Sequence, residues 1–228
     1  MAKKKLLLPG WAVPNEAYSG YFHANNIECI DFHFFGESDE VFNFDNKLAE
    51  ISSKITEPTI LFAHSMGTLF ALKLANSSEN IKGLVLFSPF AKFVEDKEYI
   101  AQEEKNVRSM KTFIKKRAKI VLKNFYSDLF SPQKDSLSIP GDLNNENLYL
   151  GLDLLQNIDL RDELQKIKVP ALIIIGEKDK IVPKETSLYV ANNLSTSKVI
   201  LIKDMGHSIP ITDKNCYKDE VNDFINKI

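Results

Sequence analysis

The chain has 228 residues, of which 44% are hydrophobic, with a formal net charge of -2 and an isoelectric point near 6.1. A chain of this length buries a full core and suits one α/β domain better than two. The small net charge argues against a protein that binds nucleic acid through its overall charge, because such binding needs a basic surface.

Cysteine content and apolar segments set further bounds. Cys29 and Cys216 are far apart and belong to no Cys/His cluster with zinc spacing, so neither a disulfide framework nor a metal site is indicated. The basic start is followed by only three leucines before Pro9, too few for a secretory signal. No segment has the apolar length of a membrane span. We expect a cytoplasmic protein that binds no membrane, and a monomer.

Short apolar runs alternate with helical patterns along the chain. Helical patterns include residues 41–55, 68–76, 186–193 and 217–228. Near-continuous apolarity is typical of parallel strands covered by helices on both faces. The sequence therefore predicts an α/β fold with a mostly parallel sheet of about six strands. The runs that predict strands cover residues 6–8, 29–35, 59–63, 84–87, 171–175 and 199–202.

The long interval between the strand ending at Phe87 and the one beginning at Ala171 has helical signals and no convincing strand. Turn signals at residues 131–132 and 139–141 divide it into shorter helices. Insertions after strand ends lie over the carboxyl edge of an open α/β sheet, where ligands bind. We expect one α/β domain over residues 1–228, with a helical cap inserted at about 90–150.

The strand at residues 59–63 runs directly into Ser65, and a helical pattern follows at once. The order strand, serine, helix is typical of a nucleophile elbow, whose usual form is G-x-S-x-G. Here Ala63 replaces the first glycine and Gly67 keeps the second. The alternative is an ordinary serine at a helix N-terminus. The strand-to-helix context favours the elbow.

Two further polar residues follow predicted strands. Asp179 lies in the loop after the strand at 171–175, and His207 lies in the loop after the last strand. Each alone is open to a structural interpretation, as a surface acid or a core histidine. Together with Ser65 they occur in the order Ser, Asp, His at carboxyl ends of strands, which is the order expected of α/β-hydrolases.

The predicted roles follow from the chemistry of each group. A serine hydroxyl needs a base to take its proton, so His207 is expected within hydrogen-bonding reach of Ser65. Asp179 is expected to fix the imidazole tautomer. The oxyanion needs backbone donors, normally the N–H after the nucleophile and one from the loop after an earlier strand. These are Met66 and Trp11.

The residues at 7–11, the Ser65 elbow, the loop at 176–183 and the segment at 206–210 together resemble α/β-hydrolases. More narrowly, Gly10, Trp11 and the segment at 151–167 resemble the pimeloyl-[acyl-carrier protein] methyl ester carboxylesterases of biotin synthesis. The resemblance implies a serine carboxylesterase without a cofactor, in which Trp11, Met66 and Phe125 contact the acyl group. It covers nearly the whole chain. Family members usually have a strand hairpin before this segment, whereas we expect the given sequence to start directly at the strand before Gly10, and it has Pro9 where they have histidine.

The predicted cap carries charge of one sign. No acid occurs from Lys105 to Ser127, and seven of the eight basic residues fall on one side of a helical wheel, whereas Arg117 projects toward the apolar side. The alternatives are an ordinary solvated face and a docking surface for an acidic partner. The family resemblance implies acyl-carrier protein as that partner. The docking residues are predicted to be Arg108, Lys111, Lys115, Arg117 and Lys119, with Arg117 reaching the phosphate of the carrier's prosthetic arm.

The most specific interpretation is therefore hydrolysis of the methyl ester of pimeloyl-acyl-carrier protein through an acyl-enzyme on Ser65. A thioesterase or a general short-acyl esterase with the same three residues is the nearest alternative. A relative that has lost catalysis and binds a ligand or carrier is the alternative from another class. Intact Ser65, Asp179 and His207 argue against that last possibility.

Overall fold

The computed structural model describes residues 3–18, 20–212 and 216–228. Within these ranges the strands form a single parallel sheet in the order β2-β1-β3-β4-β5-β6. The α/β fold with about six strands is confirmed. The strands are β1 (Lys4–Leu8), β2 (Glu28–Cys29), β3 (Thr59–His64), β4 (Ile81–Phe87), β5 (Ala171–Gly176) and β6 (Ser197–Ile202).

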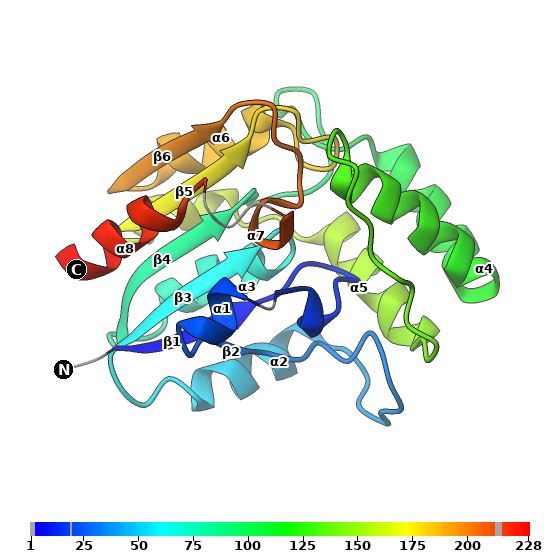
Figure 1. Cartoon of the computed structure of the whole chain (residues 1–228), viewed down its shortest axis with the longest axis horizontal. Coiled ribbons are helices and arrows are strands. Elements are labelled where there is room, and N and C mark those ends of the chain that lie inside the picture. Colours follow the sequence, from blue (N-terminus) through cyan, green and yellow to red (C-terminus); the bar gives the residue numbers. More distant parts are fainter. Residues whose placement is uncertain (1–2, 19, 213–215) are drawn as a thin grey trace.

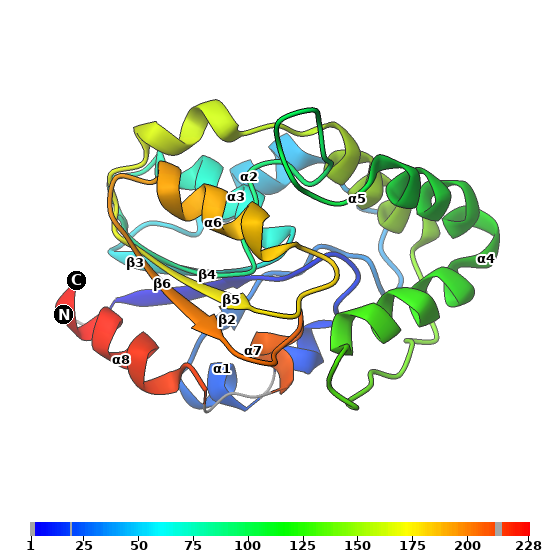
Figure 2. The same cartoon turned by 90° about the horizontal axis from the view of Figure 1, so that it is seen from above.

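Helices cover both faces of the sheet (Figure 2). One face is covered by α2 (Phe44–Ser53), α3 (Gly67–Ala75) and α6 (Lys184–Asn193), and the other by α1 (Tyr21–Ala24), α7 (Ile209–Thr212) and α8 (Lys218–Lys227). Every residue of β3 and β5 is buried, which explains why their sequences are almost wholly apolar. The described residues also form two short 3-10 helices, η1 (Asn15–Tyr18) and η2 (Arg161–Lys166).

The second strand is much shorter than the sequence predicts. The apolar run at residues 29–35 suggested a full strand, but β2 ends at Cys29. His33 has a positive φ of 55°, which turns the backbone away from the sheet. Ile30, Phe32 and Phe34 are buried as loop side chains, and the centroid of the Phe32 ring lies 4.8 Å from that of Phe70 on α3. Burial without strand pairing produced the misleading pattern.

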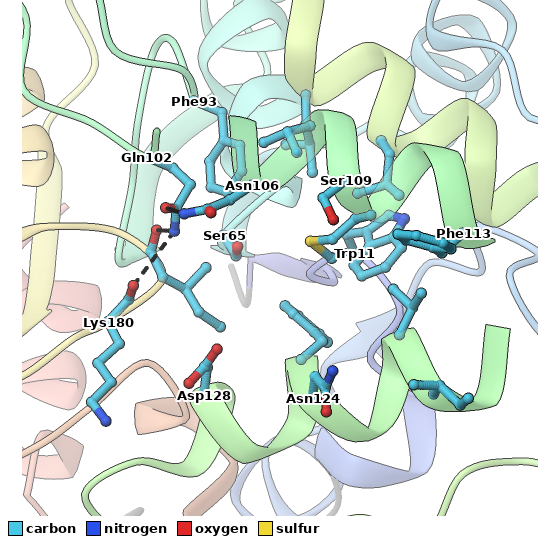
Figure 3. A pocket seen from close by; sticks show the side chains of 18 of the residues that line it. Trp11, Ser65, Phe93, Gln102, Asn106, Ser109, Phe113, Asn124, Asp128 and Lys180 are labelled. Carbon is cyan, nitrogen blue, oxygen red and sulfur yellow. Dashed lines mark hydrogen bonds between the residues drawn. The ribbon is translucent and has the colours of Figure 1, made fainter. Parts of the chain in front are cut away.

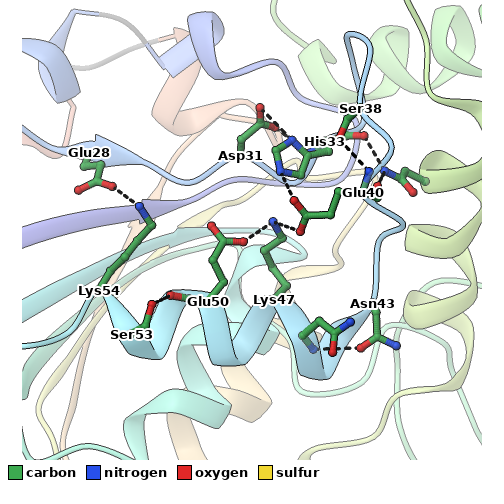
Figure 4. Close-up of polar contacts among 12 residues, drawn as sticks. Glu28, Asp31, His33, Ser38, Glu40, Asn43, Lys47, Glu50, Ser53 and Lys54 are labelled. Atoms are coloured by element: carbon green, nitrogen blue, oxygen red, sulfur yellow. Dashed lines mark hydrogen bonds and ion pairs between the residues drawn. The ribbon is translucent and has the colours of Figure 1, made fainter.

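Polar contacts hold the loop between β2 and α2 (Figure 4). Glu40 pairs with His33 at 3.0 Å and with the buried ammonium of Lys47 at 3.3 Å. The Asn43 side chain accepts a hydrogen bond from the Asn46 N–H at 3.0 Å and so caps α2. This cap explains why the helix begins at Phe44, three residues later than the sequence pattern suggested.

Two helices between β4 and β5 lie beyond the carboxyl ends of the strands, at the right of Figure 1. We call α4 (Glu104–Phe130) and α5 (Asn145–Asn157), which pack against each other, the cap. Arg117 has non-helical φ and ψ of -139° and 39°, so α4 consists of two arms joined by a kink. No described helix is both long and apolar enough to cross a lipid bilayer.

Candidate active site

Ser65 lies at the junction between β3 and α3, with its side chain 7% exposed. Its φ is 52°, in the left-handed region that a residue with a Cβ seldom adopts. The Ser65 N–H donates to the Phe87 carbonyl at 3.0 Å, and the Ser65 carbonyl accepts from the Thr68 hydroxyl at 2.6 Å. Bonds to the neighbouring strand and to the helix that follows therefore hold the strained turn.

Gly67 explains why the elbow needs a small residue two positions after the serine. A Cβ at Gly67 would overlap the backbone carbonyls of Leu8 and Pro9 at the end of β1. The close approach between α3 and β1 leaves no room for a side chain there. The first small position of the elbow is Ala63, which is fully buried in β3. The strand-turn-helix geometry matches the expectation from the sequence.

The loops after β5 and β6 bring Asp179 and His207 together. His207 Nδ1 donates to Asp179 Oδ2 at 2.7 Å, and both side chains are almost fully buried. Asp179 Oδ1 accepts the backbone N–H groups of Ile181 and Val182 at 2.9 and 2.8 Å. The carboxylate is thus fixed on one side by its own loop and orients the imidazole on the other.

Ser88, which the sequence analysis missed, also binds the carboxylate. Its hydroxyl donates to Asp179 Oδ2 at 2.7 Å, so this oxygen accepts both Ser88 and His207. Ser88 follows β4 directly, is fully buried and has a positive φ of 47°. The available signal was a serine at the carboxyl end of a predicted strand, the same position as Ser65, but its neighbour Pro89 made it resemble an ordinary turn residue.

A closed ring of contacts joins the three predicted residues. Ser65 binds the carbonyl of Phe87, the adjacent Ser88 binds Asp179, and Asp179 binds His207. The ring closes where the His207 carbonyl lies 3.0 Å from the side chain of His64, the residue before Ser65. Three loops remote in sequence therefore meet at one edge of the sheet.

The buried Nε2 atom of His207 has no hydrogen-bond partner among the described residues. Because Nδ1 carries the proton given to Asp179, Nε2 has a free lone pair. No hydrogen bond joins it to the Ser65 hydroxyl in the described ranges. Such contacts are often open in an unliganded site and form when substrate binds. The arrangement leaves a base and a hydroxyl available for proton transfer.

The predicted oxyanion donors come from two segments, since Met66 follows Ser65 within the elbow and Trp11 lies in the loop after β1. For the backbone N–H groups of Trp11 and Met66 we find no acceptor among the described residues, so both are available to a ligand. Two side-chain bonds hold the Trp11 loop. The indole Nε1–H of Trp11 donates to the Leu148 carbonyl at 2.9 Å, and the Tyr126 hydroxyl donates to the Ala12 carbonyl at 2.9 Å.

The Trp11 ring packs closely against the cap. A Cβ at Gly151 of α5 would lie 2.6 Å from the Trp11 ring, so this glycine makes room for the indole. The Phe125 ring of α4 meets the indole edge to face, with a centroid distance of 4.9 Å. Two segments that carry the family resemblance, Gly10–Trp11 and 151–167, therefore meet at one contact.

A cavity of about 530 Å³ lies between the two arms of α4 and extends to Ser65 (Figure 3). More than half of its lining residues are apolar, and polar side chains such as Asn106, Asn124 and Asp128 lie among them. The predicted contacts Trp11 and Phe125 line the cavity. Met66 does not, because its side chain is fully buried, so only its N–H remains available for substrate. No group of three described His, Cys, Asp or Glu residues is arranged to hold a metal ion.

The predicted docking residues divide into two groups. Arg108, Lys111 and Lys115 have acidic partners: Arg108 pairs with Glu104, and the two lysines pair with Asp153 and Glu146 of α5 at 2.6 and 2.8 Å. These three charges therefore have counter-charges within the protein itself, and their docking role stays a prediction. Their counter-charges lie on α5 and at the start of α4, outside the stretch that appeared acid-free.

Arg117 and Lys119 form the second group. Neither has an acidic partner within the described residues, and both line a smaller surface cavity beside the kink of α4. Arg117 also lines the cavity that leads to Ser65. The sequence predicted that Arg117 projects toward the apolar side of a regular helix, whereas it lies at the helix break itself. Arg117 therefore reaches the cavity because the helix breaks at this residue, and not because of its place on a helical wheel.

Comparisons with known proteins bear on this geometry. The family model Hydrolase_4, described as serine aminopeptidase S33, matches residues 39–215. The chain belongs to this family. The α/β-hydrolase recognised in the sequence is thereby confirmed. A solved esterase from Exiguobacterium antarcticum has the same fold, with a TM-score of 0.80 and 23% identity over 99% of this chain and 90% of that one.

Two curated relatives of this α/β-hydrolase carry the same name, pimeloyl-[acyl-carrier protein] methyl ester esterase. The one from Legionella pneumophila (strain Paris) is 22% identical over 225 residues, covering 96% of this chain and 94% of its own. The one from Neisseria meningitidis (strain H44/76) is 25% identical over 241 residues, covering 98% and 93%. The chain is thus a hydrolase. Its sequence predicts a carboxylic ester hydrolase, and both relatives are named as enzymes of that class.

Proposed function

We propose that the chain is a serine carboxylesterase that hydrolyses the methyl ester of pimeloyl-acyl-carrier protein, using Ser65, His207 and Asp179. The observation that carries the proposal is the closed ring of contacts around Ser65, which leaves Nε2 of His207 buried and free. The names of the two relatives support the substrate. In this proposal residues 1–228 form one domain, and α4 and α5 roof its active site.

Acylation begins when the Ser65 hydroxyl attacks the ester carbonyl carbon and passes its proton to Nε2 of His207. The bond to Asp179 stabilises the imidazolium that forms. The N–H groups of Trp11 and Met66 donate to the oxyanion of the tetrahedral intermediate. Collapse of this intermediate breaks the bond to the methoxy oxygen, which takes the proton from His207 and leaves as methanol.

Deacylation repeats the same steps with water. His207, again neutral, takes a proton from a water molecule as its oxygen attacks the acyl-enzyme carbonyl. The second tetrahedral intermediate breaks the bond to Ser65 Oγ, which regains its proton from His207. The products are the free carboxylic acid on the carrier and the unchanged enzyme. No step needs a cofactor.

The cleft fits a medium-length acyl chain attached to a larger carrier. Its apolar side chains accommodate methylene groups, and the Trp11 and Phe125 rings, which contact each other, line the same cavity as Ser65. At the kink of α4, Arg117 and Lys119 carry positive charge without an acidic partner in the described ranges. We propose that these two residues meet acidic groups of the carrier, with Arg117 at the phosphate of its prosthetic arm.

The test compares three substrates with the purified protein: the methyl ester of pimeloyl-acyl-carrier protein, a free short-chain methyl ester, and an acyl-carrier thioester. We expect the highest kcat/KM for the carrier-linked methyl ester and complete loss with Ser65→Ala. Faster hydrolysis of the thioester would replace the proposal with a thioesterase. Equal rates on free and carrier-linked esters would indicate a general esterase. Undiminished turnover by Ser65→Ala would exclude the proposed nucleophile.

A further inference from the structure

A second histidine lies fully buried beneath the proposed catalytic centre and has no part in the steps above. His64, the last residue of β3, is next to Ser65, and its ring centroid lies 4.8 Å from that of His207. Its Nδ1 atom lies 2.7 Å from the Tyr18 hydroxyl, and its Nε2 atom lies 3.0 Å from the His207 carbonyl oxygen. The Tyr18 oxygen also accepts the Gly10 N–H at 2.9 Å.

These partners determine the tautomer of His64. The His207 carbonyl oxygen can only accept, so Nε2 of His64 must carry the ring proton, and the Tyr18 hydroxyl, whose oxygen accepts the Gly10 N–H, donates its own proton to Nδ1. Nδ1 is therefore unprotonated, and the proton of the neutral ring sits on Nε2 and is donated to the carbonyl of His207. Burial, with the neighbouring His207 as a second cause, holds the pKa of His64 well below its usual value, which keeps the ring neutral.

The two histidines consequently carry their protons on different nitrogens. In His207 the proton is on Nδ1, where Asp179 accepts it, and Nε2 is free. In His64 it is on Nε2, where it binds the backbone of His207. The ring of His207 is thus held by Asp179 and its backbone by His64, so the position of Nε2 is fixed from two directions.

We infer that His64 is a positioning residue that ties the His207 loop to the Gly10–Trp11 loop. The chain of bonds runs from the Gly10 N–H through the Tyr18 hydroxyl and the His64 ring to the His207 carbonyl. One end supports the loop of the Trp11 oxyanion donor and the other supports the base. The inference deepens the proposed function, since it rests on the roles given there to Trp11 and His207.

Ser65 stands between the two ends of this chain of bonds. A Cβ at Gly10 would lie 3.2 Å from Nδ1 of His64 and 3.3 Å from Cβ of Ser65, so the first loop is in close contact with both. If the Gly10–Trp11 loop moves, the distance from the Trp11 N–H to the reacting carbonyl changes. If His207 moves, the distance from its Nε2 atom to the Ser65 hydroxyl changes. Small displacements of reacting groups cost large factors in rate, whereas they change substrate binding in the outer cleft little.

The kinetic test uses a short p-nitrophenyl ester and three variants. His64→Gln keeps an acceptor for Tyr18 and a donor for the His207 carbonyl, whereas His64→Leu removes both. We expect kcat to fall about 100-fold in His64→Leu, with little change in KM, and to stay near the wild-type value in His64→Gln. Tyr18→Phe, which removes only the hydroxyl that binds Gly10 and His64, should lower kcat about 10-fold.

Tyr21→Phe is the matched control, because the Tyr21 hydroxyl binds Asn222 and neither active-site loop. It should leave kcat unchanged. A folded His64→Leu protein with wild-type kcat would overturn the inference, as would a loss confined to KM or a His64→Gln protein as impaired as His64→Leu. If His64→Leu does not fold, Tyr18→Phe decides: a kcat equal to that of Tyr21→Phe overturns the inference.

A spectroscopic test does not depend on activity. The chain has four histidines, so ¹⁵N-histidine NMR can resolve each ring. In the Ser65→Ala protein at pH 7 we expect the proton of His64 on Nε2 and that of His207 on Nδ1. A His64 proton on Nδ1 would overturn the inference. Because this protein lacks the nucleophile, the result stands whether or not the proposed ester substrate is correct.

Discussion

The loops at the carboxyl ends of the strands and the cap hold their polar groups in opposite ways. At the strand ends, Asp179 accepts four hydrogen bonds and the polar side chains that surround it are buried. In the cap, most basic side chains of α4 are exposed, and their ion pairs are of the surface kind that contributes about 0 to 1 kcal/mol. The first region holds its polar side chains in fixed positions, whereas the exposed side chains of the second are free to change position.

The largest effect expected from disturbing the first region is that of Asp179→Asn. The oxygen of the new amide can keep the bonds from Ile181 and Val182, which leaves its NH₂ group facing Nδ1 of His207. A donor there favours the His207 tautomer with the proton on Nε2, which removes the base. We expect kcat to fall about 10⁴-fold in a protein with unchanged stability.

Steady-state kinetics on a p-nitrophenyl ester, with thermal unfolding as the measure of stability, checks this prediction. An Asp179→Asn enzyme that retains a tenth of the wild-type kcat would contradict the role given to the carboxylate.

The second expected effect concerns stability and pH. His64 stays neutral in the folded protein, where the neutral Tyr18 hydroxyl and His207 face it, but binds a proton in the unfolded chain below about pH 6.5. The free energy of unfolding should therefore fall as the pH drops below 6.5, and the contribution of His64 should approach about 1.4 kcal/mol per pH unit.

Urea denaturation of the wild type and His64→Gln between pH 5 and 8 measures this contribution as a difference. The variant has no titrating group at this position, so its stability should fall less steeply below pH 6.5. Parallel curves for the two proteins would show that His64 is protonated when folded.

A smaller effect is expected for Ser88→Ala, which removes one of the two donors to Asp179 Oδ2. A hydrogen bond to a charged group contributes about 1.5 to 3 kcal/mol, so kcat should fall roughly 10-fold or more. Ser187→Ala is the matched control, because the Ser187 hydroxyl is equally buried but binds the Pro89 carbonyl. Kinetics of both variants on one ester checks this. Equal kcat values in Ser88→Ala and Ser187→Ala would show that the bond from Ser88 to Asp179 does not contribute to catalysis.

The smallest effect is expected in the cap, from Lys119→Glu. Reversal of this unpaired charge should lower kcat/KM for the carrier-linked methyl ester about 5-fold relative to a free ester, and most at low salt. Lys198→Glu makes the same charge change on the exposed edge strand β6, away from the cap. If both variants lower kcat/KM for the carrier-linked ester equally, the effect comes from the net charge of the protein. The carrier then does not dock at Lys119.

The same contrast explains what the sequence could reveal. Ser65 and Asp179 each follow a buried apolar strand, and His207 follows the apolar but largely exposed edge strand β6, so the fold itself predicts that they meet at one edge. The Lys111–Asp153 pair could not be predicted, because the partner lies on a helix far along the chain. The kink at Arg117 has no proline or glycine signal beside it.

Buried polar contacts between residues far apart in the sequence were equally hidden. A histidine before the serine and a tyrosine early in the chain show no common pattern, yet His64 and Tyr18 meet at 2.7 Å. The apolar run after Cys29 predicted a strand because periodicity reports burial, and aromatic packing in a loop buries residues as well. The residues that could be predicted are those whose position follows from the order of the strands. The residues that could not be predicted are positioned by tertiary contacts.

The most direct test of the central claim is covalent labelling with a fluorophosphonate, read by mass spectrometry of the intact and digested protein. We expect one phosphonyl group per chain, attached to Ser65, and labelling slowed by orders of magnitude in His207→Ala. Attachment to another residue, or equally fast labelling without His207, would contradict the claim that these loops join a serine and its base.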